Sequence, residues 1–244
     1  RAFRSRGLVV QPFKKGPDYI DASWLSASSG QHCRNLDVFL MSEETLVKNF
    51  ELASVGHDFL VIEGNMGLYD GIDSSGKGSS AYLARLLHTP VILVINTSRM
   101  TRSVAALVKG YQIFEPETPV AGVILNNVSG LRHEAKLVNA IEGYCNIPVV
   151  GSIPRDTNIS IPERHLGLVP FGESVSGNLT IGRILRVVER HLKLDSILSI
   201  AKSAEAYTTK TLKRKKCEEA KVTIGVIFDK AFRFYYPENL EALE

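Results

Sequence analysis

VILVINTSRMTRSVAALVKGYQIFEPETPVAGVIL, residues 91–125, decides the fold class of this chain. It begins with an apolar run, Val91 to Ile95, and ends with a second one, Val120 to Leu125. Between them, residues from about Ser103 to Phe114 have the spacing of an amphipathic helix. Apolar strands that alternate with amphipathic helices are typical of a parallel sheet with helices on both faces. We therefore predict an α/β fold built on such a sheet.

The same alternation extends to both sides of this stretch. Further strands are predicted at residues 8–13, 58–63 and 148–153. Further helices are predicted at residues 23–30, 42–54 with Ser42 as N-cap, 79–87, 131–144, and about 178–202 as one long helix. Because ligands bind at the carboxyl ends of strands in such sheets, the residues that follow each strand are the candidates for a site.

The sequence predicts two domains. Residues 1–199 would form the first domain, and the polar stretch at residues 200–221 would be a linker. The basic run Lys213 to Lys216 within it could be a nucleic-acid patch, but a solvated linker is the preferred interpretation. A fresh strand at 222–228 would open a second domain at residues 222–244. The chain starts inside a helical pattern that Gly7 closes and stops inside another, so we expect truncation at both ends.

Composition excludes several classes of protein. Hydrophobic residues make up 44% of the chain and charged residues 23%, which is typical of a soluble globular protein. A formal net charge of +3 is too small to argue for binding to nucleic acid or to a membrane. Three cysteines without a CxxC pair argue against a disulfide framework or a structural zinc site. A cytoplasmic location is expected, since no apolar run resembles a signal peptide or a membrane span.

Acidic residues follow two of the predicted strands. Asp18 and Asp21 come after the first strand, in KKGPDYID, and Glu63 closes the strand at 58–63. Carboxylate oxygens are the ligands that Mg²⁺ prefers, so these three residues could form a metal cluster, with Lys14 neutralising phosphate or a substrate carboxylate. The alternative is that the aspartates cap the next helix and Glu63 is an ordinary edge residue.

Three other segments could carry chemistry. Residues 71–78 nearly match the phosphate loop GxxxxGK[ST], but Gly78 replaces the Ser/Thr. The preferred interpretation is that residues 78–81 cap the next helix, although its N-terminus could still face an anion of the substrate. Asn126 and Asn127 end a strand and could recognise an adenine edge, or could simply form a turn. Arg164 and His165 lie in a proline-bounded loop, where a structural or solvated role is the alternative.

Taken together and in order, six segments resemble one family. They are PFKKGPDYID (12–21), RNLD (34–37), EGNMGLYDG (63–71), GVILNNV (122–128), PERHLGL (162–168) and YYPENLE (235–241). The chain is similar over essentially its whole length to the cobyrinic acid a,c-diamide synthases. That resemblance implies a P-loop NTPase-like domain of the dethiobiotin synthetase type, joined to a class I glutaminase domain. It also implies amidation of the a and c acetates of a tetrapyrrole dicarboxylate, with ATP, Mg²⁺, glutamine-derived ammonia and an acyl-phosphate intermediate.

The resemblance also implies roles for individual residues. These are Mg²⁺ binding for Asp18, Asp21 and Glu63; phosphate contact for Lys14; guidance of substrate or intermediate for Asp70; the adenine side for Asn126 and Asn127; and the substrate side for Tyr19, Arg164 and His165. The family's phosphate loop would precede Arg1, and its glutaminase nucleophile would follow residue 244. We therefore expect the chain by itself to be inactive.

Alternatives remain for substrate and class. Lys15 stands where many cobyrinate enzymes have a small apolar residue, and this resembles nickel-sirohydrochlorin or siroheme amidases. A partitioning-type nucleotide switch on the same fold, or a degenerate scaffold that binds tetrapyrrole, would be non-enzymatic. No nucleic-acid or membrane partner is expected, and a homodimer is left open.

Overall fold

The computed structural model describes residues 1–161, 163–164, 167–204, 222–229 and 231–243, and its strands confirm the predicted α/β class. Two three-stranded sheets are parallel throughout, with strand orders β2-β1-β3 and β4-β5-β6. Their strands are β1 (Val10–Lys15), β2 (Arg34–Leu36), β3 (Phe59–Glu63), β4 (Val91–Asn96), β5 (Val120–Val128) and β6 (Val149–Pro154). A short antiparallel pair joins β7 (Glu163–Arg164) to β8 (Gly167–Leu168).

Helices connect the strands. They are α1 (Ala2–Ser5), α2 (Ile20–Ser29), α3 (Glu43–Ser54), α4 (Ser80–Leu86), α5 (Ser103–Phe114), α6 (Leu131–Cys145), α7 (Gly177–His191), α8 (Leu194–Ala201) and α9 (Pro237–Glu241). Two short 3-10 turns, η1 (Thr157–Ile159) and η2 (Phe171–Glu173), lie between β6 and α7. None of the helices in the described part of the chain is long and apolar enough to cross a membrane.

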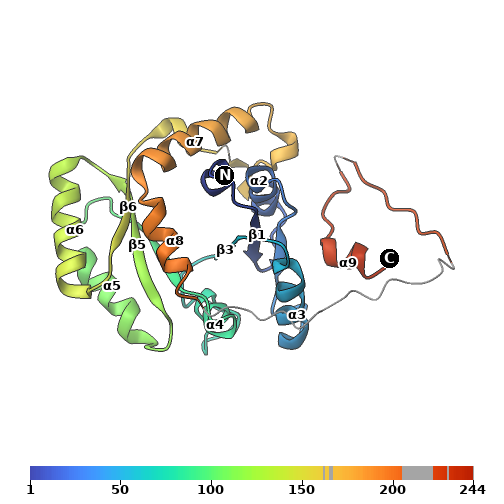
Figure 1. Ribbon diagram of the computed structural model, residues 1–244, viewed down its shortest axis with the longest axis horizontal. Helices are drawn as coiled ribbons and strands as arrows, with labels where there is room; N and C mark the ends of the chain where they lie inside the picture. The colour runs from blue at the N-terminus through green and yellow to red at the C-terminus, as the bar shows by residue number, and fades with distance from the viewer. Residues whose placement is uncertain (162, 165–166, 205–221, 230, 244) are drawn as a thin grey trace.

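Helices cover both faces of the sheets (Figure 1). On one face of β4-β5-β6, alternate residues such as Leu93 and Val123 pack against α5 and α6. On the other face, Ile92, Ile124 and Val150 pack against α7 and α8. The sheet β2-β1-β3 packs against α3 and α4 through a cluster that includes the fully buried rings of Phe13 and Phe50 and the side chains of Leu36, Leu46, Leu83 and Leu87. The alternation of apolar side chains along each strand therefore produces the layers that the sequence predicts.

The two sheets share an apolar cluster but no hydrogen-bonded ladder among the described strands. Val10 and Phe59 from one sheet belong to the same buried cluster as Val150 from the other, together with residues of α1, α7 and α8. β3 and β4 are edge strands of their sheets. Val61 on β3 is 36% exposed and Val94 on β4 is 65% exposed, although both sit in the middle of apolar runs.

Several local predictions are confirmed. The Ser42 side chain accepts a hydrogen bond from the backbone N–H of Thr45 and so caps α3. Ser79 caps α4 in the same way, as predicted for residues 78–81. Gly7 follows α1 with a φ of +88°, as a glycine that ends a helix should. The short strand β2 was not predicted, because three residues are too few to show a period.

The prediction of one long helix at about 178–202 is wrong. The chain leaves helical geometry at Leu192, whose φ is −106° and ψ 139°, and starts α8 two residues later. At the break, the backbone of Leu192 forms a bridge with Gly151, and the N–H of Lys193 donates to the carbonyl of Val150. The continuous apolar face misled the prediction, since both helices pack on the same side of β6.

This break depends on the missing side chain at Gly151. A Cβ there would lie 2.1 Å from Cδ2 of Leu192 and 3.2 Å from its Cα. We expect Gly151→Ala to lower the free energy of unfolding by about 1–3 kcal/mol through overpacking. Gly182→Ala on α7, where a Cβ would meet nothing within 4 Å, should raise it by about 0.5–1 kcal/mol through helix propensity. Urea denaturation of both variants checks the pair, and equal effects would contradict the close approach.

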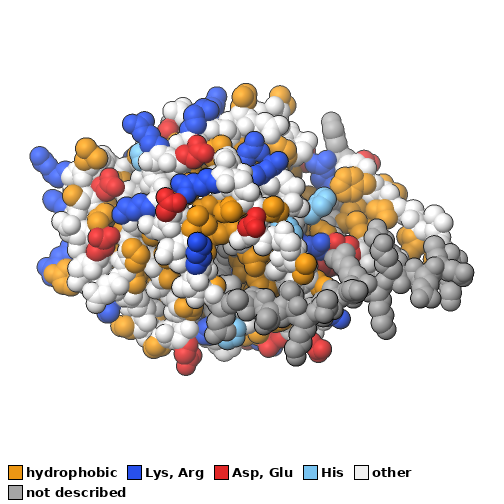
Figure 2. Space-filling view, in the orientation of Figure 1, with side chains coloured by type: hydrophobic (Ala, Val, Ile, Leu, Met, Phe, Trp, Pro, Cys, Tyr) orange, Lys and Arg blue, Asp and Glu red, His pale blue; other side chains and the backbone are white. Residues whose placement is uncertain are grey.

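The predicted strand at 222–228 is not formed in the structure. Residues 222–229 have no assigned strand, and Val222, Ile224 and Phe228 are 74%, 52% and 70% exposed. A strand needs a neighbouring ladder, and this segment has none among the described residues. Figure 2 shows hydrophobic side chains gathered at the right of the molecule, where Figure 1 places the C-terminal segment. Most of the predicted linker, residues 205–221, lies outside the described residues.

Candidate functional site

The predicted cluster of charges is brought together around the ammonium group of Lys14. Lys14 Nζ lies 2.8 Å from Oδ2 of Asp21, 3.6 Å from Oε1 of Glu63 and 3.7 Å from Oδ2 of Asp18. It also donates to the carbonyl of Gly64 at 3.3 Å. The lysine side chain is only 3% exposed, whereas those of Asp18, Asp21 and Glu63 are 24%, 27% and 44% exposed. The arrangement is a buried cation with three carboxylates that open toward solvent.

Backbone geometry explains this convergence. Lys14 and Glu63 are register partners in the parallel ladder between β1 and β3, near the carboxyl ends of both strands. Gly16 then turns the chain with a φ of +76°, and α2 begins at Ile20. Oδ1 of Asp18 accepts a hydrogen bond from the backbone N–H of Asp21, which fixes the entry into α2. The spacing in KKGPDYID therefore places both aspartates above the end of β1.

Burial and charge act in opposite directions within the cluster. Burial alone would lower the pKa of Lys14, but the hydrogen bond to Asp21 and the charges of Glu63 and Asp18 outweigh it, so this pKa lies above its ordinary value. Burial raises the pKa of Glu63, and the Lys14 ammonium opposes that rise only in part. The lysine is therefore held charged, while Glu63 gains a proton more readily on acidification than an ordinary glutamate does.

Asn35 on β2 holds the loop that carries Asp18. The sequence analysis did not identify it as a site residue. Its side-chain amide donates to the carbonyls of Gly16 at 2.7 Å and Asp18 at 2.9 Å. The residue is 3% exposed and is the ladder partner of Lys14. Satisfying two loop carbonyls in a buried place holds the turn that presents Asp18. The segment RNLD was noted as a motif, but a single asparagine in a short strand carries no periodic signal.

Asp70 lies in the loop between β3 and α4, and the structure does not bring its carboxylate into the Lys14 cluster. Its Oδ2 accepts the backbone N–H of Gly67 at 2.9 Å, and the residue is exposed. Its carbonyl accepts a hydrogen bond from the buried Lys15 ammonium at 3.4 Å. Burial lowers the pKa of Lys15, and the nearby Asp70 charge partly opposes this. Lys15 therefore ties the loop to β1.

The carboxylates of Asp18, Asp21 and Glu63 can be compared with the ligands that Mg²⁺ prefers. Three carboxylates face one ammonium, so two negative charges remain for a hard cation, and all three oxygen donors reach solvent, where Mg²⁺ would keep several waters. Within the described residues, no group of three His, Cys, Asp or Glu side chains is arranged to hold a metal ion, because the carboxylates converge on Lys14. The chemistry fits Mg²⁺, and binding would require side-chain rotation.

Asn126 and Asn127 lie at the carboxyl end of the other sheet, within β5 and not after it. Oδ1 of Asn126 accepts the backbone N–H of Asn127, whose φ is +60°. The Asn127 amide donates to Oδ1 of Asn96 at 3.1 Å, so these two side chains join the ends of β4 and β5. No contact between them and the Lys14 cluster is recorded in the described part of the chain.

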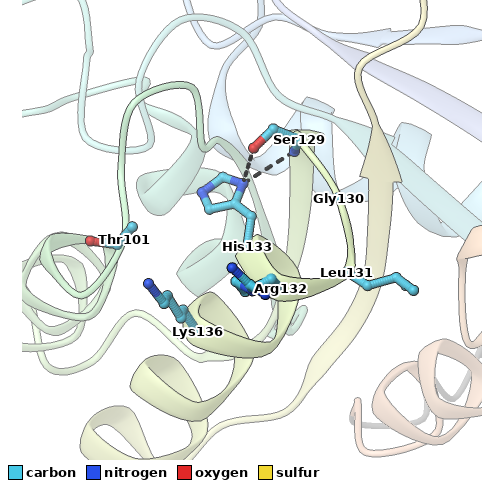
Figure 3. A pocket seen from close by; sticks show the side chains of 7 residues that line it. All are labelled: Thr101, Ser129, Gly130, Leu131, Arg132, His133 and Lys136. Carbon is cyan, nitrogen blue, oxygen red and sulfur yellow. Dashed lines mark hydrogen bonds between the residues drawn. The ribbon is translucent and has the colours of Figure 1, made fainter.

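A cavity of about 490 Å³ opens beside these asparagines, where β5 leads into α6. Figure 3 shows the side chains that line it, which are those of Thr101, Ser129, Leu131, Arg132, His133 and Lys136, together with Gly130. Nδ1 of His133 accepts the N–H of Ser129 at 3.1 Å, and Nε2 lies 2.6 Å from the carbonyl of Met100. These contacts suit the tautomer that carries its proton on Nε2. The sequence analysis missed this cavity, because loop residues carry no period.

The predicted substrate residues are not brought together by described contacts. The ring of Tyr19 stacks on Tyr236 with centroids 4.9 Å apart, and on Phe234 at 5.2 Å. Arg164 belongs to the two-residue strand β7, but its side chain lies outside the described structure, as does the whole of His165. Tyr19 is thus involved in a contact inside the chain.

Comparison with known proteins identifies relatives over almost the whole chain. Residues 1–169 match the model of the CobQ/CobB/MinD/ParA nucleotide binding domain. A protein of Magnetococcus marinus named cobyrinate a,c-diamide synthase is 45% identical over 99% of this chain and 53% of its own length. Proteins with the same name from Archaeoglobus fulgidus and Methanobrevibacter smithii are 40% and 43% identical, over 100% and 96% of this chain and 53% and 52% of their own lengths. The chain spans about half the length of these relatives.

Proposed function

Because the chain belongs to the CobQ/CobB/MinD/ParA nucleotide-binding domain family, we propose that it is the ATP-dependent part of a cobyrinate a,c-diamide synthase. The observation that carries the proposal is the buried Lys14 ammonium, which lies among three carboxylates at the carboxyl ends of β1 and β3. Phosphoryl transfer depends on positioning and charge neutralisation, and this cluster supplies both kinds of group in one place. Identity of 40–45% to proteins of that name supports the substrate class.

In the proposed reaction, a substrate acetate oxygen attacks the γ-phosphorus of ATP, and ADP leaves. Ammonia derived from glutamine then attacks the acyl carbon, and phosphate leaves as the amide forms. Lys14 would neutralise a phosphate oxygen, and its fixed position means that little reorganisation is needed at that moment. Asp18, Asp21 and Glu63 would hold Mg²⁺, which would neutralise further phosphate charge.

The remaining predicted residues have more peripheral roles in this proposal. Asn126 and Asn127 would lie at the adenine side, with the side-chain oxygen of Asn96 fixing the orientation of the Asn127 amide. Asp70 would guide substrate from a loop whose position depends on Lys15. Since Lys15 has this contact inside the chain, its presence gives no reason to prefer a sirohydrochlorin-type substrate. Arg164 and His165 stay predictions for the substrate side.

The test is ADP release by the protein at its full natural length, with Mg²⁺ and glutamine, offered cobyrinic acid and nickel-sirohydrochlorin separately. We expect turnover and a diamide product with cobyrinic acid, and loss of turnover by about 10²-fold or more in Asp18→Ala and Glu63→Ala. Turnover with nickel-sirohydrochlorin alone would move the protein to the nickel-tetrapyrrole pathway. Nucleotide binding without turnover on either substrate would overturn the amidoligase and favour a nucleotide switch.

A further inference from the structure

A second charged cluster lies next to the Lys14 site and involves the far end of the chain. The guanidinium of Arg34 on β2 donates to both carboxylate oxygens of Glu241, at 2.8 and 2.6 Å, and to Oε1 of Glu238 at 3.1 Å. Arg34 and Glu241 are 207 positions apart in sequence. The side chains of Arg34, Glu238 and Glu241 are 15%, 10% and 23% exposed, so little water screens these pairs. A two-oxygen contact of this kind is the geometrically specific form of an arginine–carboxylate pair.

Aromatic contacts extend the same interface toward the site. Tyr236 is 3% exposed, and its ring stacks on Tyr19 with an interplanar angle of 17°. Its hydroxyl donates to Oδ2 of Asp37 at 3.2 Å. The other oxygen of Asp37 accepts the backbone N–H groups of Phe39 and Leu40, so this buried carboxylate joins the segment to the turn after β2. Phe234 adds a second ring to the stack on Tyr19.

This interface touches the residues that present the site carboxylates. Tyr19 lies between Asp18 and Asp21 in sequence and is the N-cap residue of α2. Arg34 is adjacent to Asn35, whose amide holds the carbonyls of Gly16 and Asp18. β2 therefore contacts the Asp18 turn through the side chain of Asn35, and it contacts the C-terminal segment through the side chain of Arg34.

We propose that residues 234–241 are a docking segment for the surface formed by Tyr19, Arg34 and Asp37, and that this docking positions Asp18 and Asp21 around Lys14. Arg34 and Tyr236 are positioning residues in this scheme, since neither contacts the Lys14 ammonium. The inference deepens the proposed function and rests on it only for its catalytic consequence. The positioning of Asp18 and Asp21 by residues 234–241 does not depend on which reaction the protein catalyses.

One feature of the interface opposes docking. Oε2 of Glu238 is buried and has no hydrogen-bond partner within the described residues. A buried carboxylate oxygen without a partner carries a desolvation cost, which offsets part of what the ion pair with Arg34 contributes. This cost lowers the net stability of the docked segment, and by the proposal a displacement of residues 234–241 would change the positions of Asp18 and Asp21.

A charge-swap experiment tests the proposal. Arg34→Glu and Glu241→Arg are made singly and together in a Glu238→Gln background, so that no carboxylate at position 34 faces the Glu238 carboxylate. Amide hydrogen exchange is measured in the chain for residues 16–23 and 234–241, with the Glu238→Gln chain as the parent. We expect each single variant to speed exchange in both segments by about tenfold. The double variant, which restores an ion pair with the charges exchanged, should return both segments to within about twofold of the parent. Reversing the exposed pair Arg6–Asp195 in the same way is the matched control and should leave residues 16–23 unchanged.

A second readout separates this inference from the proposed function. In the enzyme at full natural length, the single variants should raise the Mg²⁺ concentration for half-maximal ADP release by about fivefold or more, with the double variant restored. Faster exchange confined to residues 234–241, or a double variant that is not restored, would overturn the positioning role. Should the charge reversals unfold the chain, Glu241→Gln is the milder variant judged by the same two segments. If the enzyme releases no ADP with any substrate, the exchange measurements still decide the question of docking.

Discussion

Replacing Lys14 by methionine is expected to reduce ADP release by roughly 10²- to 10³-fold while leaving the fold in place. Methionine has nearly the same length and suits the buried stem, but it cannot neutralise a phosphate oxygen. The three carboxylates, at 2.8 to 3.7 Å from the ammonium, lose the cation that they share. Because Asp18, Asp21 and Glu63 keep partial exposure, we expect a loss of only about 1–3 kcal/mol in the free energy of unfolding.

The pH dependence of this stability loss follows from the same charges. In Lys14→Met, Glu63 loses the ammonium that opposes the effect of its burial, so its pKa in the folded state rises further above its ordinary value. The folded state of the variant then binds protons more readily than its unfolded state. The loss in free energy of unfolding relative to the parent should therefore become smaller as the pH falls toward 4. Urea denaturation between pH 4 and 8 measures it. Lys48→Met, at an exposed position of α3, is the control and should stay within about 0.5 kcal/mol of the parent. ADP release within threefold of the parent would remove Lys14 from the proposed reaction.

Asn35→Asp is expected to have the largest effect on stability, with a loss of about 3–5 kcal/mol at pH 7. The substitution changes the side-chain volume little, but it turns an amide that donates to two carbonyls into a carboxylate that faces them. Gly16 and Asp18 then lose their partners in a place where the residue is only 3% exposed. A buried charge without a donor is the costliest defect that a one-atom change can introduce.

The sign of the pH effect distinguishes this explanation from simple loss of packing. Burial raises the pKa of the new carboxyl group in the folded state, whereas in the unfolded chain it titrates near about 3.9. The loss should therefore be smallest near pH 4, where the protonated group can donate one hydrogen bond, and should grow as the pH rises from there. Asn139→Asp on the exposed face of α6 is the matched control and should change stability by less than about 0.5 kcal/mol. A loss that is equal at pH 4 and pH 8 would contradict the role given to the amide.

Much of the fold could be predicted, because long apolar runs and amphipathic helices leave a periodic signal. The helix at 103–114 and the Ser42 cap are examples where local sequence and structure agree. The break at Leu192 could not be predicted, since it depends on the close approach of Gly151 from another part of the chain. For the same reason β2 was missed, and the apolar run at 222–228 was taken for a strand although strands require a partner.

The site was predictable in its residue types but not in its geometry. Carboxylates after two strands indicated a cation, and the structure does gather Asp18, Asp21 and Glu63. That Lys14 would lie at their centre, and that Asn35 would hold the turn, depends on the parallel register of β1 with its neighbours. Tyr19 was assigned to the substrate side from resemblance, whereas its ring is stacked on Tyr236. Contacts between distant segments leave no trace in local sequence.

The division of the strands into two sheets affects how the molecule can respond to a ligand. β3 and β4 share no backbone ladder in the described structure. The halves are held by apolar contacts, which are non-directional, and by side-chain contacts such as the Arg85–Glu115 ion pair. Small sliding between the halves would break no hydrogen bond of either sheet. A ligand that contacted both the Lys14 cluster in one half and the asparagines in the other would connect the two sheets directly. Its binding would therefore stiffen the whole molecule, and not only the residues that it contacts.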